Sequence, residues 1–248
     1  MKKALELQKE SVYYYWLAES YWEFGQSEEK SLYRKDKQFT LTNLLQGARL
    51  NAQDGNIFAS LGRYYQYIEN DIEKAKKCYQ KALSHLPLQE LASRELADIY
   101  EKEKNFQEVK KIYEQITSLS GSNNYPPATP GHLVWAWSKL GTLQFTQFGN
   151  YEDAASCFKN LLRLNDSHHD SLFALGECYY HQQMLMAALR VYQKYLSVYP
   201  NSIPAHCRIS SIQHQLGTFL QTNIFTFFPS QKTDTNLNFS IKDCTKKQ

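Results

Sequence analysis

Histidine and acidic side chains of the kind that bind metals occur together at one place in this sequence. His168 and His169 are adjacent, with Asp166 and Asp170 close on either side. Imidazole and carboxylate groups are zinc ligands, but adjacent residues in a turn point apart, and no further Cys or His follows at helical spacing. A surface turn between two helices is therefore the favoured interpretation, and we predict no metal site.

Other residue patterns that could support catalysis are weak. The carboxylate pairs Glu28–Glu29 and Glu152–Asp153 fall in turns or first helical turns, where acidic groups favour the helix dipole. The phosphate-binding, dinucleotide-binding, zinc-protease and serine-hydrolase motifs GxxxxGK[ST], GxGxxG, HExxH and GxSxG do not occur. We therefore predict a chain that is not an enzyme and that carries no cofactor.

Two kinds of residue could instead bind a macromolecule. Trp135 and Trp137 could form a binding platform, although Trp137 falls at a repeat position that is normally buried, so we assign Trp137 to the core and leave Trp135 open. Two groups of basic residues could contact RNA or an acidic partner, but nearby acidic residues favour a solvated outer face. The two basic groups are Lys74, Lys76, Lys77 and Lys81, and Arg34, Lys35 and Lys37.

Composition limits the class of protein. The net charge of +3 over 248 residues is too small to indicate nucleic-acid binding, and 42% hydrophobic residues are enough for a core. The five cysteines are scattered, which favours reduced thiols in the cytosol or nucleus over a disulfide framework, and Cys178 is interpreted as a small core residue. The sequence contains no apolar run long enough to span a membrane.

The elements that position these residues follow a repeat. Over residues 149–200, two segments superimpose with a period of 34 residues, so that Ala154 aligns with Ala188 and Phe158 with Tyr192. This period, with small, aromatic and proline landmarks, is the signature of tetratricopeptide repeats. Each repeat is a pair of antiparallel helices, and stacked pairs supply the core. We therefore predict an all-α solenoid, a right-handed superhelix of helix pairs.

The predicted array occupies residues 11–218, after a lead-in at 1–10. Its units fall at about 11–53, 55–87, 88–120, 134–168 and 169–202, with a half unit at 203–217. The predicted landmarks are Leu61, Gly62, Tyr65, Ala75, Tyr79, Ala82, Pro87, Trp137, Gly141, Ala154, Phe158, Gly176, Tyr179, Ala188, Tyr192 and Pro200.

Three segments depart from this pattern. The charged stretch around residues 27–37 is predicted to lengthen the turn of the first unit, and residues 120–131 are predicted to form a loop because of their prolines and glycines. After Gly217 no helical period is recognised, so residues 219–248 are predicted to be a disordered tail of a truncated or alternatively terminated product. The alternative is that Phe225–Phe228 folds back as a cap.

One surface can be compared with a known binding mode. A clamp for a C-terminal carboxylate, as in some chaperone adaptors, needs amide and cationic donors on the first helices. The residues after the small first-helix position are acidic in three of five units, and none is Asn. They are Glu19, Arg63, Asp98, Thr142 and Glu177. This surface is expected to repel a carboxylate, which argues against a chaperone adaptor.

The repeats resemble one family more specifically. The segments WLAESYWEFG, LGRYYQYIENDIEKAKKCYQKAL, VWAWSKLG, LGECYYHQQ and SSIQHQLG are similar, over about residues 10–218, to the tetratricopeptide scaffold subunits of the superkiller (Ski) complex in their animal form. Those subunits are far longer, so the resemblance implies an internal section. It also implies a non-catalytic scaffold in the cytoplasm, with the nucleus as a second location, that contacts a DExH-box RNA helicase and WD-repeat subunits.

Through these partners the resemblance implies a part in messenger RNA decay from the 3′ end by the exosome, with RNA contact indirect at most. The partner-binding residues are not indicated by the sequence. Two alternatives stay open: another tetratricopeptide adaptor without the carboxylate clamp, in chaperone or transport function, and a regulatory array for an enzyme on a longer chain.

Overall fold

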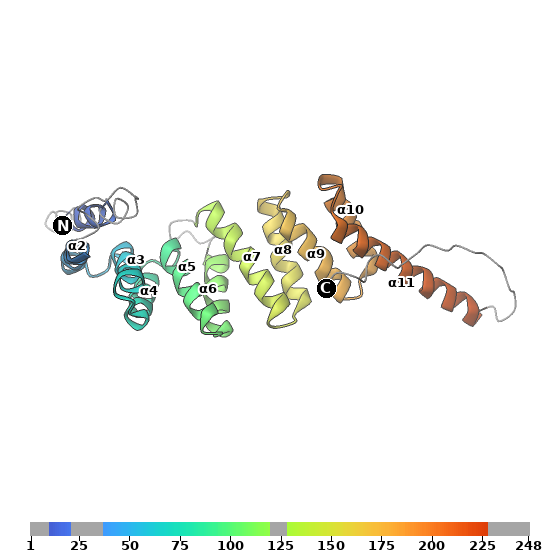
Figure 1. Ribbon diagram of the computed structural model, residues 1–248, viewed down its shortest axis with the longest axis horizontal. Coiled ribbons are helices and arrows are strands. Elements are labelled where there is room, and N and C mark those ends of the chain that lie inside the picture. The colour runs from blue at the N-terminus through green and yellow to red at the C-terminus, as the bar shows by residue number, and fades with distance from the viewer. Residues whose placement is uncertain (1–9, 21–36, 120–127, 228–248) are drawn as a thin grey trace. The chain divides into compact units, whose positions relative to one another are not determined.

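The computed structural model describes residues 10–20, 37–119 and 128–227, and all regular structure in these ranges is helical (Figure 1). The elements after the helical residues 10–20 are α2 Lys37–Leu50, α3 Gly55–Tyr64, the π-helix η2 Tyr65–Glu69, α4 Ile72–His85, α5 Glu90–Lys102, α6 Phe106–Leu119, α7 Pro130–Thr146, α8 Tyr151–Leu164, α9 His169–His181, α10 Leu185–Val198 and α11 Ile203–Phe227.

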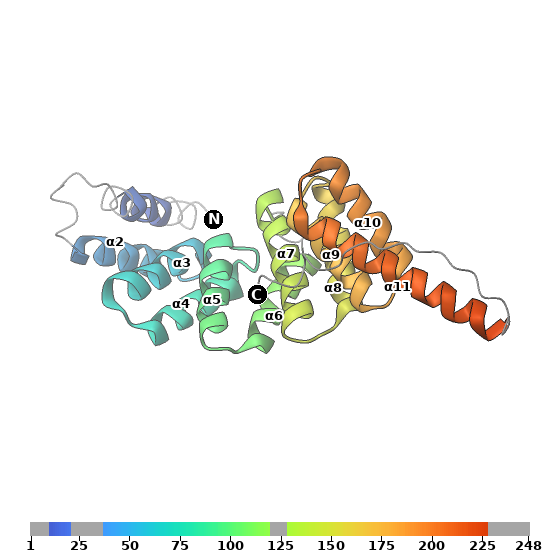
Figure 2. The same cartoon turned by 45° about the vertical axis from the view of Figure 1, so that its right-hand side comes forward.

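The helices form two compact units, residues 1–140 and 141–248, and α7 contributes to both. In the first unit α3 packs against α4, α4 against α5, and α5 against α6; in the second, α8 packs against α9, α9 against α10, and α10 against α11. Figures 1 and 2 show this succession of neighbours within each unit. In these pairs each helix packs against the helix next to it in sequence, which is how stacked helical repeats build a core.

Polar residues in the turns define where the helices begin. Asp71 accepts a hydrogen bond from the backbone N–H of Lys74 at 3.0 Å at the start of α4, and Asn150 accepts one from Asp153 N at 3.2 Å at the start of α8. His168 caps α9 in the same way, through Nδ1 and the N–H of Ser171. These side chains satisfy donors that the first helical turn leaves unpaired.

The ends of four helical segments share one backbone feature. Asn70, Lys104, Gly149 and Gln183 all have positive φ, between 55° and 62°. Lys104 follows Asn70 by 34 positions, and Gln183 follows Gly149 by 34 positions. A residue in the left-handed region commonly ends a helix, and its return at this interval matches the period of a tetratricopeptide unit.

Three glycines are in close contact with an aromatic ring of the next helix. A Cβ at Gly62 would lie 2.5 Å from the ring of Tyr79, and one at Gly176 would lie 2.7 Å from the ring of Tyr192. Gly141 has the same relation to Phe158, at 2.8 Å. The glycines therefore provide the space that the rings occupy, and any side chain there would force the helix pair apart.

The predicted landmarks differ in their burial. Most are buried, whereas Tyr65, Trp137 and Tyr179 are half-buried and Pro200 is exposed. The buried ones are Leu61, Gly62, Ala75, Tyr79, Ala82, Pro87, Gly141, Ala154, Phe158, Gly176, Ala188 and Tyr192. Cys178 is fully buried in the core of the second unit, as its interpretation as a core residue requires.

Of the two adjacent tyrosines at the end of the first helix of the repeat at 55–87, Tyr64 is fully buried, whereas the predicted landmark Tyr65 is half-buried. The same pattern occurs in the regular helix α9, where Cys178 is fully buried and Tyr179 is half-buried. The π-helix η2 follows Tyr64, and the N–H of Asn70 donates to the carbonyl of Tyr65. A π-turn rotates the side chains that follow it relative to a regular helix. In α2, Gly47 is buried and in close contact with Ile57.

The last helix is longer than the sequence pattern predicts. α11 continues from Ile203 to Phe227, so the predicted end at Gly217 is wrong. An isolated glycine costs only about 1 kcal/mol inside a helix, and no proline lies between Gly217 and Pro229. Residues 228–248, the remainder of the predicted tail, lie outside the described residues. In the described part of the chain no helix is both long and apolar enough to cross a membrane.

Candidate functional site

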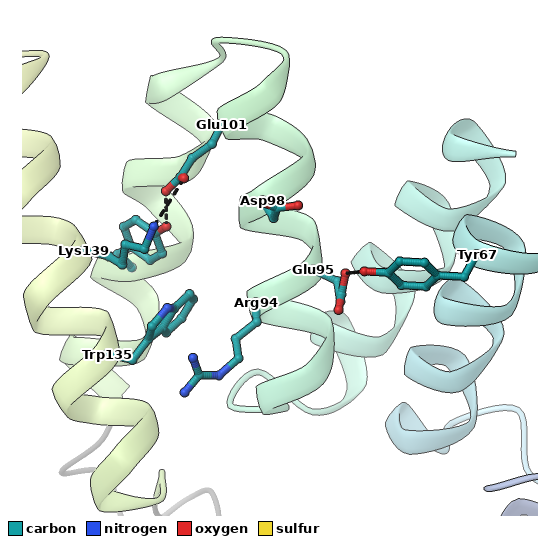
Figure 3. A pocket seen from close by; sticks show the side chains of 8 residues that line it. Tyr67, Arg94, Glu95, Asp98, Glu101, Trp135 and Lys139 are labelled. Carbon is teal, nitrogen blue, oxygen red and sulfur yellow. Dashed lines mark hydrogen bonds and ion pairs between the residues drawn. The ribbon is translucent and has the colours of Figure 1, made fainter. Parts of the chain in front are cut away.

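A cleft of about 220 Å³ opens on the first unit, where α5 lies between η2 and α7 (Figure 3). Its walls combine carboxylates, cations and aromatic rings. The lining residues are Tyr67, Arg94, Glu95, Asp98, Glu101, Tyr113, Trp135 and Lys139.

The acidic edge of the cleft comes from a single helix. Glu95, Asp98 and Glu101 are spaced by three residues along α5, so their side chains project from one face of the helix. Glu95 Oε2 accepts hydrogen bonds from Tyr67 Oη at 2.8 Å and from Gln66 Nε2 at 2.9 Å. Figure 3 shows the Glu95–Tyr67 contact. Because these donors come from η2, the π-turn fixes the position of the carboxylate.

The opposite end of the acidic edge is tied to α6 and α7. Glu101 accepts a hydrogen bond from Tyr113 Oη at 2.6 Å and pairs with Lys139 Nζ at 3.4 Å. Asp98, between the other two carboxylates, pairs with the exposed Lys102 at 2.5 Å. Both side chains of this pair are at least half exposed, so water screens the pair and the Asp98 carboxylate stays accessible from the cleft.

Trp135 forms the aromatic wall of the cleft. The guanidinium carbon of Arg94 lies 4.4 Å from the Trp135 ring centroid, which is a cation–π contact. Tyr113 packs edge-on against the same indole, and His132 stacks on it. Arg94 also pairs with Glu90 at 2.8 Å. The sequence left the role of Trp135 open, and the structure places it on the surface of a cleft.

The electrostatics of the cleft follow from these contacts. Three carboxylates face two cations, so the lining carries a formal charge of −1 at neutral pH. Burial and the hydrogen bond to Glu95 raise the pKa of Tyr67 to about 12. Burial and the hydrogen bond to Glu101 raise the pKa of Tyr113 as well. Both phenols therefore stay protonated near neutral pH and keep donating to the carboxylates.

Candidates for metal binding or catalysis lie elsewhere. His168 caps α9 and His169 is exposed beside Asp170. Glu152 and Asp153 are exposed in the first turn of α8, whereas Glu28 and Glu29 lie outside the described residues. Among the residues that the structure describes, no group of three or more His, Cys, Asp and Glu side chains could hold a metal ion.

The predicted basic face on α4 is neutralised in part by its neighbours. Lys74 pairs with Asp71 at 2.9 Å, and Lys76 pairs with both Glu73 and Glu103, at 2.6 and 2.8 Å. Lys81 lies over the ring of Phe58. The side chains of the second basic group, Arg34, Lys35 and Lys37, lie outside what the structure describes.

Two of the residues at the positions that were compared with a carboxylate clamp are bound by other side chains of the same chain. Arg63, the only cation among them, pairs with Glu19 at 2.5 Å, and Glu19 accepts a further hydrogen bond from Ser60. Glu177 binds Arg208. The cation is thus engaged by an acid of the same chain.

Sequence analysis did not assign the cleft. The spacing of Glu95, Asp98 and Glu101 was a usable signal, because it predicts one acidic helix face. The contribution of Tyr67 could not be read from its position, since it depends on the π-turn.

Comparison with protein families supports the fold class. Two tetratricopeptide-repeat models match, one over residues 145–203 and one over residues 95–123. Among solved structures, YrrB, described as a tetratricopeptide protein with an unusual peptide-binding site, aligns over 70% of this chain and 84% of its own, with a TM-score of 0.55 and 18% identity. PilF of Pseudomonas aeruginosa aligns over 91% of this chain and 95% of its own, with a TM-score of 0.51 and 15% identity. The predicted class, an all-α tetratricopeptide-repeat solenoid, is confirmed.

Comparison with curated proteins shows which tetratricopeptide-repeat proteins this chain resembles in sequence. Superkiller complex protein 3 of Homo sapiens is 27% identical over 219 residues, which is 88% of this chain. Superkiller protein 3 of Schizosaccharomyces pombe is 22% identical over 82% of the chain. The match covers 13% of the human protein and 14% of the yeast protein. The resemblance to the Ski complex scaffold subunit in its animal form, predicted from the repeat segments, is confirmed.

Proposed function

We propose that this chain is a non-catalytic protein–protein scaffold of the Ski complex type. Its partners are a DExH-box RNA helicase and WD-repeat subunits, and through them it serves decay of messenger RNA from the 3′ end by the exosome. The observation that carries this proposal is the similarity to superkiller complex protein 3 over 88% of the chain. Its place of action is the cytoplasm, with the nucleus as a second location.

The charge distribution supports partners that are proteins. The cleft on the first unit has a formal charge of −1, and two of the lysines of α4, Lys74 and Lys76, are paired with acids of the same chain. Phosphate binding needs cations that are free to replace counterions. RNA contact through these described surfaces is therefore indirect, by way of the helicase.

A general tetratricopeptide adaptor, in chaperone or transport function, is the second candidate. The structure supports only a version without the carboxylate clamp, because Arg63 is already paired with Glu19. An adaptor of this kind would bind other clients through the same cleft, and it would not recover the helicase.

The test is affinity purification of the tagged full chain from cytosolic extract, followed by mass spectrometry, and then direct binding to the purified helicase and WD-repeat subunits. Recovery of these subunits, with direct binding of at least one, is the expected result. A folded chain that recovers chaperones or transport proteins instead, or that binds none of the purified subunits, contradicts the proposal. Measurable ATP hydrolysis by the purified chain alone would contradict its non-catalytic part.

A further inference from the structure

The cleft on the first unit contains a carboxylate that has no cationic partner among the described residues. Arg94 pairs with Glu90 and Lys139 pairs with Glu101, so neither of the two lining cations pairs with Glu95. The two donors to Glu95, Tyr67 and Gln66, are neutral groups. Within the described chain this carboxylate is thus held by neutral donors, and a cation brought by a partner could pair with it.

The orientation of Glu95 is fixed before any partner binds. The hydroxyl of the fully buried Tyr79 donates to Gln66 Oε1 at 2.9 Å, and Gln66 Nε2 donates to Glu95. Both hydrogen bonds that Glu95 accepts end on Oε2, so within the described chain Oε1 has no donor. An ionised carboxylate can accept about four hydrogen bonds. Oε1 is therefore a preorganised acceptor on the cleft wall.

The size of the cleft limits what can enter. A volume of about 220 Å³ is below the roughly 300–1,000 Å³ of pockets that enclose small-molecule ligands, and it suits a single long side chain. Aromatic side chains, Tyr67 among them, line the cleft, and Asp98 provides a second carboxylate beside Glu95. Two acids next to aromatic rings complement a planar guanidinium, which binds carboxylates through paired donors and stacks on rings.

We propose that this cleft receives one arginine side chain from an extended segment of a partner protein, with the guanidinium between Glu95 Oε1 and the Asp98 carboxylate. The inference rests on the proposed function only in taking the partner to be a protein. It adds the chemistry that the partner must present. A terminal carboxylate or a nucleic-acid phosphate would be repelled by the same pair of acids.

The test uses the full chain and a fluorescently labelled peptide, Gly-Ser-Arg-Ser-Gly, titrated to millimolar concentrations by fluorescence anisotropy. Matched peptides carry citrulline, lysine or glutamate in place of the arginine. Citrulline keeps the shape of arginine and removes its charge. We expect saturable binding of the arginine peptide that weakens with added salt, and at least about tenfold weaker binding of the citrulline peptide, because charge-assisted hydrogen bonds to both acids are lost. The lysine peptide is expected to bind with intermediate affinity.

The variant carrying Glu95→Gln and Asp98→Asn is expected to bind the arginine peptide at least about tenfold more weakly. Glu108→Gln is the matched control, since Glu108 lies on α6 of the same unit and pairs with Lys111 outside the cleft. Circular dichroism verifies that each variant is folded. Equal binding of the citrulline peptide, unchanged binding by the double variant, or absence of saturable binding by the arginine peptide would each overturn the inference.

Two further measurements test whether the cleft binds an anion instead, and whether the cleft assignment and the Ski-type function stand independently. Binding of the glutamate peptide or of a single-stranded RNA oligonucleotide that is lost in the double variant would assign the cleft to an anion and overturn the inference. Arginine-peptide binding without recovery of the helicase would leave the cleft assignment standing and reject the Ski-type function. Recovery of the helicase by a chain that does not bind the arginine peptide would support the Ski-type function and reject the cleft assignment.

Discussion

Glu95 in the first unit and Glu177 in the second are linked to the packing of their units in similar ways, but they differ in charge compensation. A buried tyrosine whose ring lies against a glycine sends a hydrogen bond toward each carboxylate: Tyr79 acts through Gln66 on Glu95, and Tyr192 donates to Glu177 directly at 2.5 Å. Glu177 is also bound by Arg208 through Nε and Nη2, both at 2.7 Å.

The difference shows how one scaffold can use the same residue type for two purposes. The Arg208 fork saturates both oxygens of Glu177, so this acid holds α9 to α11. In the first unit the nearby cations pair with other acids, and Glu95 keeps an oxygen for a partner. Charge compensation within the chain thus distinguishes a structural carboxylate from a binding one.

The largest expected effect comes from the glycine beneath Tyr192. Gly176→Ala places a Cβ 2.7 Å from that ring, which must move and take its hydroxyl away from Glu177. Overpacking of this kind typically costs about 1–3 kcal/mol of the free energy of unfolding. The measurement is urea denaturation followed by circular dichroism.

Gly217→Ala is the control for this substitution, because a Cβ at Gly217 meets no atom within 4 Å. Alanine is preferred over glycine in a helix interior by about 1 kcal/mol, so this variant should unfold at a higher urea concentration. A Gly176→Ala protein with an unchanged midpoint would show that the contact with Tyr192 is not a constraint.

A smaller loss of unfolding free energy is expected when Arg208, the cation that binds Glu177, is removed. Arg208→Met leaves the Glu177 carboxylate, whose side chain is 13% exposed, without its charged partner. Because Arg208 itself is 40% exposed, we expect about 1–2 kcal/mol, at the low end for a lost charged partner. Adding Glu177→Gln should restore part of the loss, and a double variant no more stable than Arg208→Met would argue against the charge explanation.

Glu95→Gln tests whether the carboxylate of the first unit is dispensable for stability, in contrast to Glu177. Its neutral amide oxygen can still accept from Tyr67 and Gln66, and no ion pair of the described chain is broken. The free energy of unfolding should therefore change by less than about 0.5 kcal/mol, by the same urea assay. A loss as large as that of Arg208→Met would mean that Glu95 is structural after all.

The last prediction concerns stability at alkaline pH. The pKa of Tyr67 is raised from 10.0 to about 12, first by burial and then by its hydrogen bond to Glu95. The folded state holds this proton after the unfolded chain has released it, so the contribution to stability is complete below pH 10 and is lost as the pH rises toward 12. Tyr67→Phe should lose less stability than the wild type between these pH values, as measured by urea denaturation at each pH. Parallel curves would contradict the assigned pKa.

Much of the fold could be predicted from sequence because the period is carried by residue types with clear packing roles. The glycines at 62, 141 and 176 and the aromatic residues at 79, 158 and 192 are the pairs that come into contact. The burial of Tyr64 was missed because the repeat pattern assigns the core position to Tyr65, whereas the residue one position earlier is the fully buried one here and in α9, where it is Cys178. The end of α11 was missed because Gly217 was interpreted as a stop signal.

The candidate site was harder to predict than the fold. Its acids lie on one helix and follow a simple spacing, but its walls come from residues 67, 113 and 135, on three other elements. Which side chains meet there depends on how helix pairs stack, and no local pattern reports that. The decisive feature, a carboxylate with neutral donors only, exists only in three dimensions.

The packing of each helix on its neighbours in sequence also governs how the chain folds. Contacts between adjacent helices close short loops, so the relative contact order within each unit is low, and helical proteins of low contact order fold in microseconds to milliseconds. Arrays of this kind lose structure from their ends inward. Hydrogen exchange should therefore be slowest in helices with a packed neighbour on both sides, such as α4 and α9.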